Sequence, residues 1–260
     1  MEQDVEDLQQ ASLDQNDRLD DHEARLQPVE DFVGNWSDLD PALVGHLSFP
    51  LTQDDIDLIQ SAVGTTVHGK QVFTSSGTFT IPTGVTKLHV ILIGGGAGGG
   101  QGGGGGSGAY CEAYNLDVTG VASIAVTIGA AGNGVSSGNG TSGGDSTFGT
   151  YLTAHGGVYG TSSGGIGGLA SGGDLNIQGG SGKDLFQFST GGLGTSHQFT
   201  GDGGSNPLGK GGPGKPNSYG FYVNGVVGTG PGAGGSGAFN DSSTPVSGGP
   251  GTAGQCIVIW

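Results

Sequence analysis

The chain has 260 residues, of which 61 are glycine, and its formal net charge at pH 7 is −16. Residues 1–66 carry 16 acidic and 2 basic side chains (−14), and residues 67–260 carry the other 7 acidic and 5 basic ones (−2). Neither part has the basic surface that binds nucleic acid, and no apolar run reaches the ~20 residues that span a bilayer. We therefore expect neither nucleic-acid binding nor membrane insertion.

Residues 1–33 are expected to form an acidic helical segment for oligomerisation or attachment. Proline and glycine are absent before Pro28, and apolar residues recur at spacings of three and four. In one heptad frame the inward positions, our candidate oligomerisation residues, are Val5, Leu8, Ser12, Gln15, Leu19, His22, Leu26 and Val29. A lone acidic helix of this length is marginal in water, which favours an α-helical coiled coil. A single frayed helix, or one docked on a partner protein, is the alternative.

Residues 34–69 are expected to form a linker with a short helix at residues 53–63. Thr52 and Asp55 have the spacing of a capping box, and Gly64 is a natural helix stop. The N-terminus is acidic and lacks the basic and apolar regions of a signal peptide. Synthesis in a cytoplasm is therefore expected.

Residues 70–260 are expected to form a glycine-rich β domain. Strand-like segments alternate with Gly, Ser and Asn turns, a pattern typical of an antiparallel β-sandwich or jelly roll. The predicted strands lie at residues 72–73, 78–81, 85–93, 109–118, 123–128, 148–152, 221–227 and 255–260. Residues 155–215 have little strand signal and are predicted to be long loops. The expected fold class is thus mainly β, with an N-terminal coiled coil followed by this sandwich.

The glycine tracts could be either packed or irregular. Residues 94–108 read GGGAGGGQGGGGGSG, without the strict third-position glycine of collagen. Chains without side chains can approach one another closely, so packed helices of the polyproline II type are one possibility. Flexible or irregular loops are the other.

One motif in this tract resembles a dinucleotide-binding fingerprint. Gly94 to Gly99 satisfies G-x-G-x-x-G directly after a strand-like segment. The fingerprint also needs a helix whose N-terminus holds the pyrophosphate, and the glycines that come next cannot sustain one. We therefore expect no nucleotide and no other cofactor.

No catalytic or metal-binding pattern stands out. The histidines are scattered without ligand spacing, and the few acids of residues 67–260 suggest no catalytic pair, although a glycosidase-type pair could still assemble in space. Cys111 and Cys256 lie in predicted strands without disulfide or metal spacing. We expect both to be buried free thiols, and the protein not to be an enzyme.

Several segments together resemble the glycine-rich domain of bacteriophage tail-fibre and tail-tip proteins. They are FTIPTGVTKLHV at residues 79–90, GGDSTFG at 143–149, AHGG at 154–157 and GGPGTAGQCIVIW at 248–260. The resemblance covers about residues 70–260. It implies a virion component at the distal end of a tail appendage, usually trimeric, that contacts the host surface. The N-terminal segment would join it to other tail or baseplate proteins, although the extended repeat shaft of long fibres is missing.

Receptor binding is expected to fall on aromatic residues in the strand-poor region. A host glycan or an outer-membrane protein would be the partner, with glycine loops supplying backbone hydrogen bonds. The candidates are Tyr159, Phe186, Phe188, His197, Phe199, Tyr219, Phe239 and Asn240. Each could instead be a loop anchor, because a glycine-rich domain has few other side chains for a core. The alternatives for the whole protein are a purely architectural virion protein of the baseplate, collar or capsid, and a secreted glycine-rich matrix protein.

Overall fold

The computed structural model describes residues 69–260, except 136–137, 191–194, 219–221 and 240–245. The chain divides into two units, residues 1–66 and 67–260. The predicted oligomerisation residues from Val5 to Val29 and the predicted helix at 53–63 lie outside the described residues. The second unit, residues 67–260, is called the body.

The expected fold class needs a correction. The described residues consist of β-strands, turns and extended chain, with no helix among them. An α-helical coiled coil is therefore not part of the fold that the structure describes, which is all-β. The expectation of a coiled coil rested on apolar spacing in residues 1–33, which indicates amphipathicity but cannot by itself establish a helix. The β-sandwich part of the expectation is confirmed.

Two antiparallel five-stranded sheets form the sandwich. The first sheet has the order β1 (Lys70–Phe73), β13 (Gln255–Ile259), β3 (Lys87–Ile93), β4 (Tyr110–Asp117), β9 (Leu175–Ile177). The second has the order β2 (Gly77–Thr80), β5 (Ser123–Thr127), β6 (Ser146–Phe148), β7 (Leu152–Ala154), β8 (Ala170–Ser171). From β5 to β8 the strands succeed one another as a meander, which is not the order of a jelly roll.

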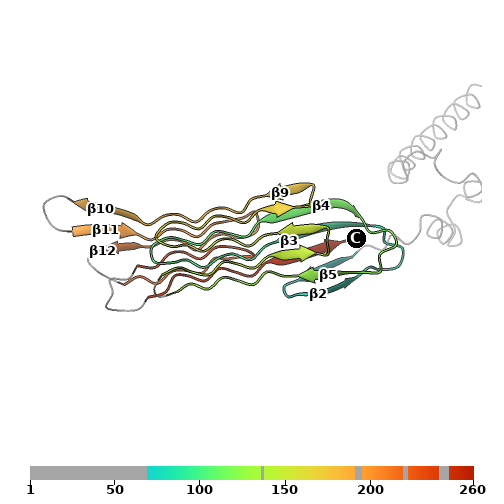
Figure 1. Ribbon diagram of the computed structural model, residues 1–260, viewed down its shortest axis with the longest axis horizontal. Helices are drawn as coiled ribbons and strands as arrows, with labels where there is room; N and C mark the ends of the chain where they lie inside the picture. The colour runs from blue at the N-terminus through green and yellow to red at the C-terminus, as the bar shows by residue number, and fades with distance from the viewer. Residues whose placement is uncertain (1–68, 136–137, 191–194, 219–221, 240–245) are drawn as a thin grey trace, which may run out of the picture. The chain divides into compact units, whose positions relative to one another are not determined.

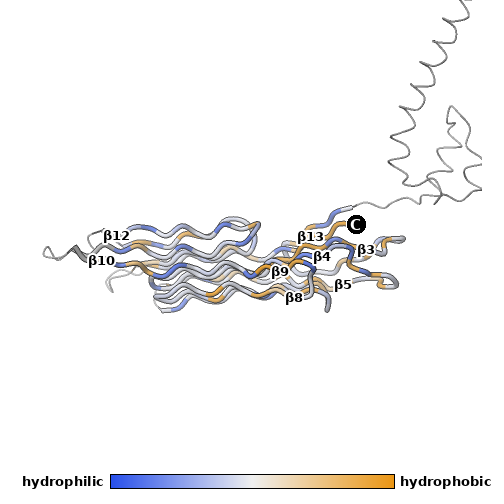
Figure 2. Tube along the Cα trace, turned by 90° about the horizontal axis from the view of Figure 1, so that it is seen from above, coloured by the Kyte–Doolittle hydropathy of each residue, from blue (hydrophilic) through white to orange (hydrophobic). Residues whose placement is uncertain are grey.

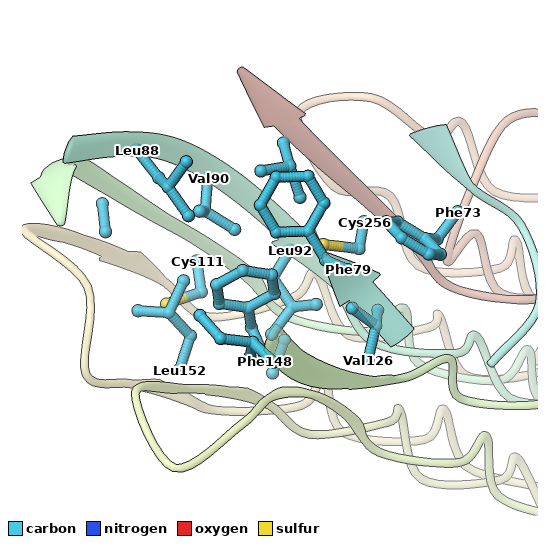
Figure 3. Packing of buried hydrophobic residues seen from close by; sticks show 14 of the residues in the cluster. Phe73, Phe79, Leu88, Val90, Leu92, Cys111, Val126, Phe148, Leu152 and Cys256 are labelled. Carbon is cyan, nitrogen blue, oxygen red and sulfur yellow. The ribbon is translucent and has the colours of Figure 1, made fainter. Parts of the chain in front are cut away.

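The hydrophobic core lies between these two sheets (Figure 3). Alternate residues of β3, namely Leu88, Val90 and Leu92, point into it and are almost fully buried. Phe79 of β2 lies at the centre, with its ring centroid 6.3 Å from that of Phe148 and 5.3 Å from that of Trp260. The last residue of the chain thus helps to close the core.

The glycine segments leave the sandwich as a bundle of extended chains (Figures 1 and 2). Their hydrogen bonds have a three-residue period. In residues 94–102, one set of amides, at Gly94, Ala97 and Gly100, donates to the carbonyls of Ala109, Gly106 and Gly103. The next set, at Gly95, Gly98 and Gln101, donates to Gly144, Thr141 and Gly138. The third set begins with Gly96 and Gly99, which donate to Thr252 and Gly249.

The returning leg of this hairpin repeats the pattern with other neighbours. The first set of amides, at Gly103, Gly106 and Ala109, donates to the carbonyls of Thr161, Val158 and His155. The second set, at Gly104 and Ser107, donates to Lys183 and Gly180. The third set, at Gly105 and Gly108, donates to Gly235 and Gly232. A chain with three residues per turn and hydrogen bonds to neighbouring segments instead of to itself has the features of polyproline II. The tracts are therefore packed helices of this type, which resolves the two possibilities left open by the sequence.

Close packing explains why these positions are glycine. A Cβ atom added to Gly99 would collide with the backbone of Ser236, and one added to Gly98 would collide with the backbone of Asn133. Backbone atoms cannot rotate away as a flexible side chain can. Any side chain here would force neighbouring helices apart and break their hydrogen bonds, so the core of the bundle is made of backbone.

A small three-stranded sheet stands at the end opposite the sandwich (Figure 1). It contains β10 (Phe186–Thr190), β11 (Thr195–Phe199) and β12 (Pro216–Ser218). The prediction of long loops over 155–215 was therefore wrong. Conversely, the described part of the predicted strand at 221–227 forms only an isolated bridge, between Val223 and Phe239.

The chain enters and leaves the body at the sandwich. Gly69 and Trp260 exchange two backbone hydrogen bonds, Gly69 N to Trp260 O at 2.8 Å and Trp260 N to Gly69 O at 3.0 Å. The small sheet consequently lies at the distal end, away from the point at which residue 69 joins the preceding chain (Figure 1).

Candidate functional site

Three phenylalanines gather on the distal sheet. Phe186 lies opposite Phe199 in the antiparallel pair β10–β11, and Phe188, two residues after Phe186, lies on the same face of β10 because side chains alternate along a strand. Their ring centroids are 6.0 Å apart for Phe186–Phe188, 6.5 Å for Phe186–Phe199 and 6.4 Å for Phe188–Phe199. We call these residues the aromatic strip.

The aromatic strip faces solvent instead of a core. Phe186, Phe188 and Phe199 are 61 %, 40 % and 43 % exposed, respectively. Leaving three phenyl rings exposed to water is unfavourable by the hydrophobic effect, and a contiguous exposed apolar patch is typical of a binding surface. The loop-anchor alternative for these residues requires burial, which they do not show. The strip can therefore bury apolar surface against a partner.

Among the other described candidates from the sequence, His197 lies in the same strand pair as the strip, whereas Tyr159 and Phe239 lie on other segments. Tyr159 is partly exposed on the glycine segment that comes after β7. Phe239 is half-buried beside Val223. His197 occupies the β11 position opposite Phe188, whereas Tyr219 and Asn240 lie outside the described residues.

A shallow pocket adjoins the strip. It has a volume of about 240 Å³ and is lined by Phe186 and Phe199 together with Lys183, Asp184, Thr200 and Asp202. Both carboxylates are already engaged with backbone, since Asp184 accepts from the amide of Gly164 at 2.7 Å and Asp202 from that of Gly214 at 2.6 Å. These acids fix the ends of glycine segments and so position the rings beside them.

A second pocket lies at the tip of the central glycine hairpin. It measures about 310 Å³, and its side chains are those of Gln101, Asn139, Thr161, Ser162, Leu185 and Phe239. Apart from Phe239, the sequence analysis missed this group. One signal was present: Gln101 is the single non-glycine residue in the run from Gly98 to Gly106.

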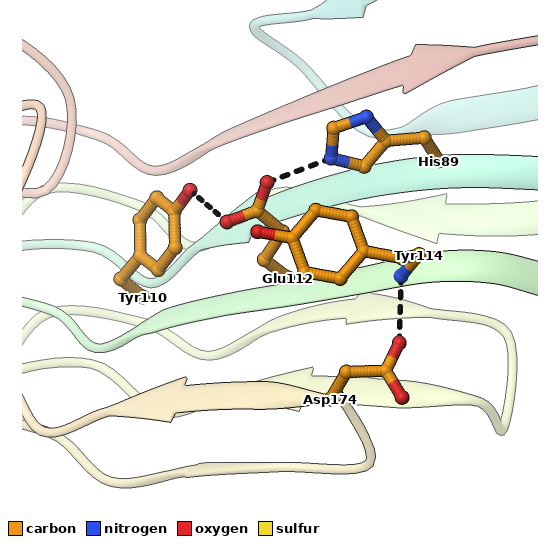
Figure 4. A network of polar contacts seen from close by, with 5 residues as sticks. All are labelled: His89, Tyr110, Glu112, Tyr114 and Asp174. Carbon is orange, nitrogen blue, oxygen red and sulfur yellow. Dashed lines mark hydrogen bonds and ion pairs between the residues drawn. The ribbon is translucent and has the colours of Figure 1, made fainter.

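A polar network on the first sheet brings further titratable groups together (Figure 4). Glu112 is buried, and its carboxylate accepts from the Tyr110 hydroxyl at 2.7 Å and lies 2.7 Å from Nε2 of His89. Burial works against ionisation, but the hydrogen bonds from Tyr110, His89 and Tyr114 outweigh it and hold the pKa of Glu112 below its usual value. The ring of Tyr114 covers His89 at 4.9 Å. An ionised, hydrogen-bonded carboxylate of this kind joins β3 to β4.

The fingerprint-like glycine motif is committed to the bundle. The amides of Gly94, Gly95 and Gly96, which a pyrophosphate would require, donate to carbonyls of the protein. The chain continues from there as an extended glycine helix and then as β4, with no α-helix among the described residues of the body. This arrangement offers a phosphate no free nest of amides.

Metal ligands do not cluster in the part of the chain that the structure describes. No group of three or more His, Cys, Asp and Glu side chains there could hold a metal ion. The same residues contain no helix long and apolar enough to cross a membrane. Cys111 and Cys256 are buried and free, as predicted.

A sandwich that anchors packed glycine helices and displays a small distal sheet defines a glycine-rich β protein. The family model described as a glycine-rich domain matches residues 73–260, and the chain belongs to this family. No curated protein matches the chain.

Proposed function

We propose that this protein is a non-enzymatic component of a bacteriophage tail fibre or tail tip that binds the host surface through the distal end of its body. The observation that carries the proposal is the aromatic strip. Three exposed rings stand at the end of the body opposite Gly69 and Trp260. A virion attachment made through residues 1–68 would thus leave the strip free to meet a cell.

The glycine bundle supports this role mechanically. Each helix of the central hairpin is hydrogen-bonded to several neighbours, so the distal sheet is carried on ordered backbone. A rigid platform loses little conformational entropy when a partner binds. Membership of the glycine-rich domain family and the resemblance of residues 70–260 to phage tail tips add to the argument.

In this proposal residues 1–33 join the protein to other tail or baseplate proteins, and the assembled protein is a homotrimer located in the virion tail. Light scattering of the full-length chain tests the oligomer. A trimeric mass agrees with the proposal, and a monomeric mass contradicts this part of it while leaving host binding open to its own test.

Host binding is tested with fluorescently labelled full-length chain and a panel of bacterial strains. Replacing Phe186, Phe188 and Phe199 by serine should abolish binding to every strain that the unaltered chain labels. Val72→Ser is the matched control, because Val72 is 45 % exposed but lies in β1 of the sandwich. If the triple variant is folded and binds normally, the strip is not the binding surface. If the unaltered chain labels no strain, the protein is better described as an architectural virion component without receptor binding.

A further inference from the structure

Backbone hydrogen bonds hold the chain at Gln101, which lines the pocket at the tip of the central hairpin. The amide of Gln101 donates to the carbonyl of Gly138 at 3.1 Å, and the amide of Gly102 donates to that of Ala238 at 2.7 Å. Gly102 has a φ of +104°, a value that glycine adopts readily, and this lets the chain turn back directly after Gln101. Two neighbouring segments therefore hold the backbone of Gln101, while its side chain is exposed at the pocket.

Gln101 is unusual for its position. Among residues 94–108 only Ala97, Gln101 and Ser107 are not glycine. Ala97 and Ser107 are fully buried in the glycine bundle, whereas Gln101 is exposed at the tip of the central hairpin. A glycine would satisfy the backbone hydrogen bonds equally well, so the packing of the bundle does not require the amide side chain.

The lining of the pocket combines neutral polar side chains with two apolar ones. Gln101 and Asn139 offer amide donors and acceptors, Ser162 offers a hydroxyl, and Leu185 and Phe239 supply apolar surface. The hydroxyl of Thr161 is already hydrogen-bonded to the backbone of Ser163. None of the described residues that line the pocket is charged, so a charged ligand would lose hydration without gaining a partner. The volume of about 310 Å³ is near the lower limit for ligand pockets, which suits one sugar ring better than a folded peptide.

We infer that this pocket binds a neutral sugar residue of a host surface glycan. The inference rests on the proposed host-binding function and names its ligand. Gln101 and Asn139 hydrogen-bond sugar hydroxyls, and the ring of Phe239 packs on the apolar face of the sugar. The aromatic strip then contacts the surface around the glycan.

Ligand-observed NMR on the full-length chain tests the inference. The probes are methyl glycosides of neutral hexoses and N-acetylhexosamines at millimolar concentration, with glucuronic acid and sialic acid as charged counterparts. At least one neutral glycoside should bind, and Gln101→Ala should weaken it about tenfold or more, the effect of losing one or two hydrogen bonds. Phe239→Leu should also weaken it while keeping apolar volume. Gln71→Ala, an exposed glutamine in β1 of the sandwich, should leave binding unchanged.

Three results would overturn the inference. They are the binding of no neutral glycoside, preferential binding of the charged sugars, and unchanged binding by a folded Gln101→Ala variant. Cell labelling separates this failure from failure of the proposed function. If Gln101→Ala labels cells normally while the strip variant does not, the host contact is made by the strip alone, as with an outer-membrane protein, and only the sugar pocket is rejected. If the unaltered chain binds a neutral glycoside through Gln101 but labels no cells, the pocket stands and the host-binding function fails.

Discussion

The amide nitrogen of Gly105 donates to the carbonyl oxygen of Gly235 at 2.8 Å, joining the centre of the glycine bundle to a segment near the C-terminus. A Cβ atom on Gly105 would lie 2.5 Å from the carbonyl oxygen of Ala97 and 2.6 Å from that of Gly98. The same residue thus bonds to one neighbour and closely approaches another. The bundle is held by backbone hydrogen bonds, which are possible because glycine has no side chain to keep the segments apart.

Gly105→Ala should therefore destabilise the body strongly. The colliding atoms belong to backbone, so we expect a loss of about 3 kcal/mol, at the upper end for overpacking. Gly77→Ala is the matched control, because a Cβ there would meet only the Phe73 ring at 3.5 Å, and its effect should stay below about 1 kcal/mol. Chemical denaturation of the full-length variants gives both values. Equal effects would show that glycine is not required by packing in the bundle.

The two aromatic clusters should respond differently to truncation. Phe79 is fully buried between Phe148 and Trp260, so Phe79→Ala should cost about 3–5 kcal/mol. Phe186 is 61 % exposed, and Phe186→Ala should change the free energy of unfolding by less than about 1 kcal/mol. A large loss for Phe186→Ala in the same denaturation experiment would mean that the strip is a core and not a surface.

The sequence predicted those parts of the fold in which side chains form a pattern. The strands at β3, β4, β5 and β13 were predicted because large apolar residues alternate there. The predicted strand at 148–152 instead forms β6 and β7 around a turn in which Gly149 has a φ of +53°, a conformation that apolar patterning does not reveal. The glycine helices carry no side-chain period. Their three-residue pattern exists only in hydrogen bonds between distant segments, which no local signal encodes.

The candidate site was predictable to a similar degree. Phe186, Phe188 and Phe199 were found because aromatic residues are conspicuous in a glycine-rich region. Their assembly on one sheet was not predicted, since β10 and β11 were expected to be loop. Asn139, Thr161 and Ser162 are of types common in any turn, and only the packing of separate segments brings them to Gln101.

The network around Glu112 should make stability depend on pH. Its pKa is lowered in the folded protein, so the stabilisation is present above the unfolded-state value of about 4.3 and is lost as pH falls through the folded value. Glu112→Gln should cost about 1–2 kcal/mol at pH 7, and the cost should shrink as pH falls below the unfolded-state value. Tyr110→Phe, which removes one donor, should show a smaller effect of the same sign. Thermal unfolding across this range measures it, and a pH-independent difference would contradict the assignment.

The two thiols should be inert in the native protein. Burial raises the pKa of both Cys111 and Cys256, that of Cys256 to about 12, and only the thiolate reacts readily with alkylating reagents. Iodoacetamide at pH 8 should leave both unmodified until denaturant is added, as mass spectrometry can monitor. Rapid labelling of Cys256 without denaturant would mean that the first sheet opens readily.

Hydrogen exchange at residue resolution tests the packed glycine bundle most directly. The amides of Gly95, Gly98, Gly104 and Gly105 each donate to a carbonyl of another segment, and they should exchange as slowly as those of Val90 and Leu92 in β3. An amide exchanges only when its hydrogen bond opens, so slow exchange of these glycine amides requires the hydrogen bonds between segments of the bundle. Exchange of the glycine amides at the rate of an unstructured chain, with β3 still protected, would show that the tracts are loops and contradict the account.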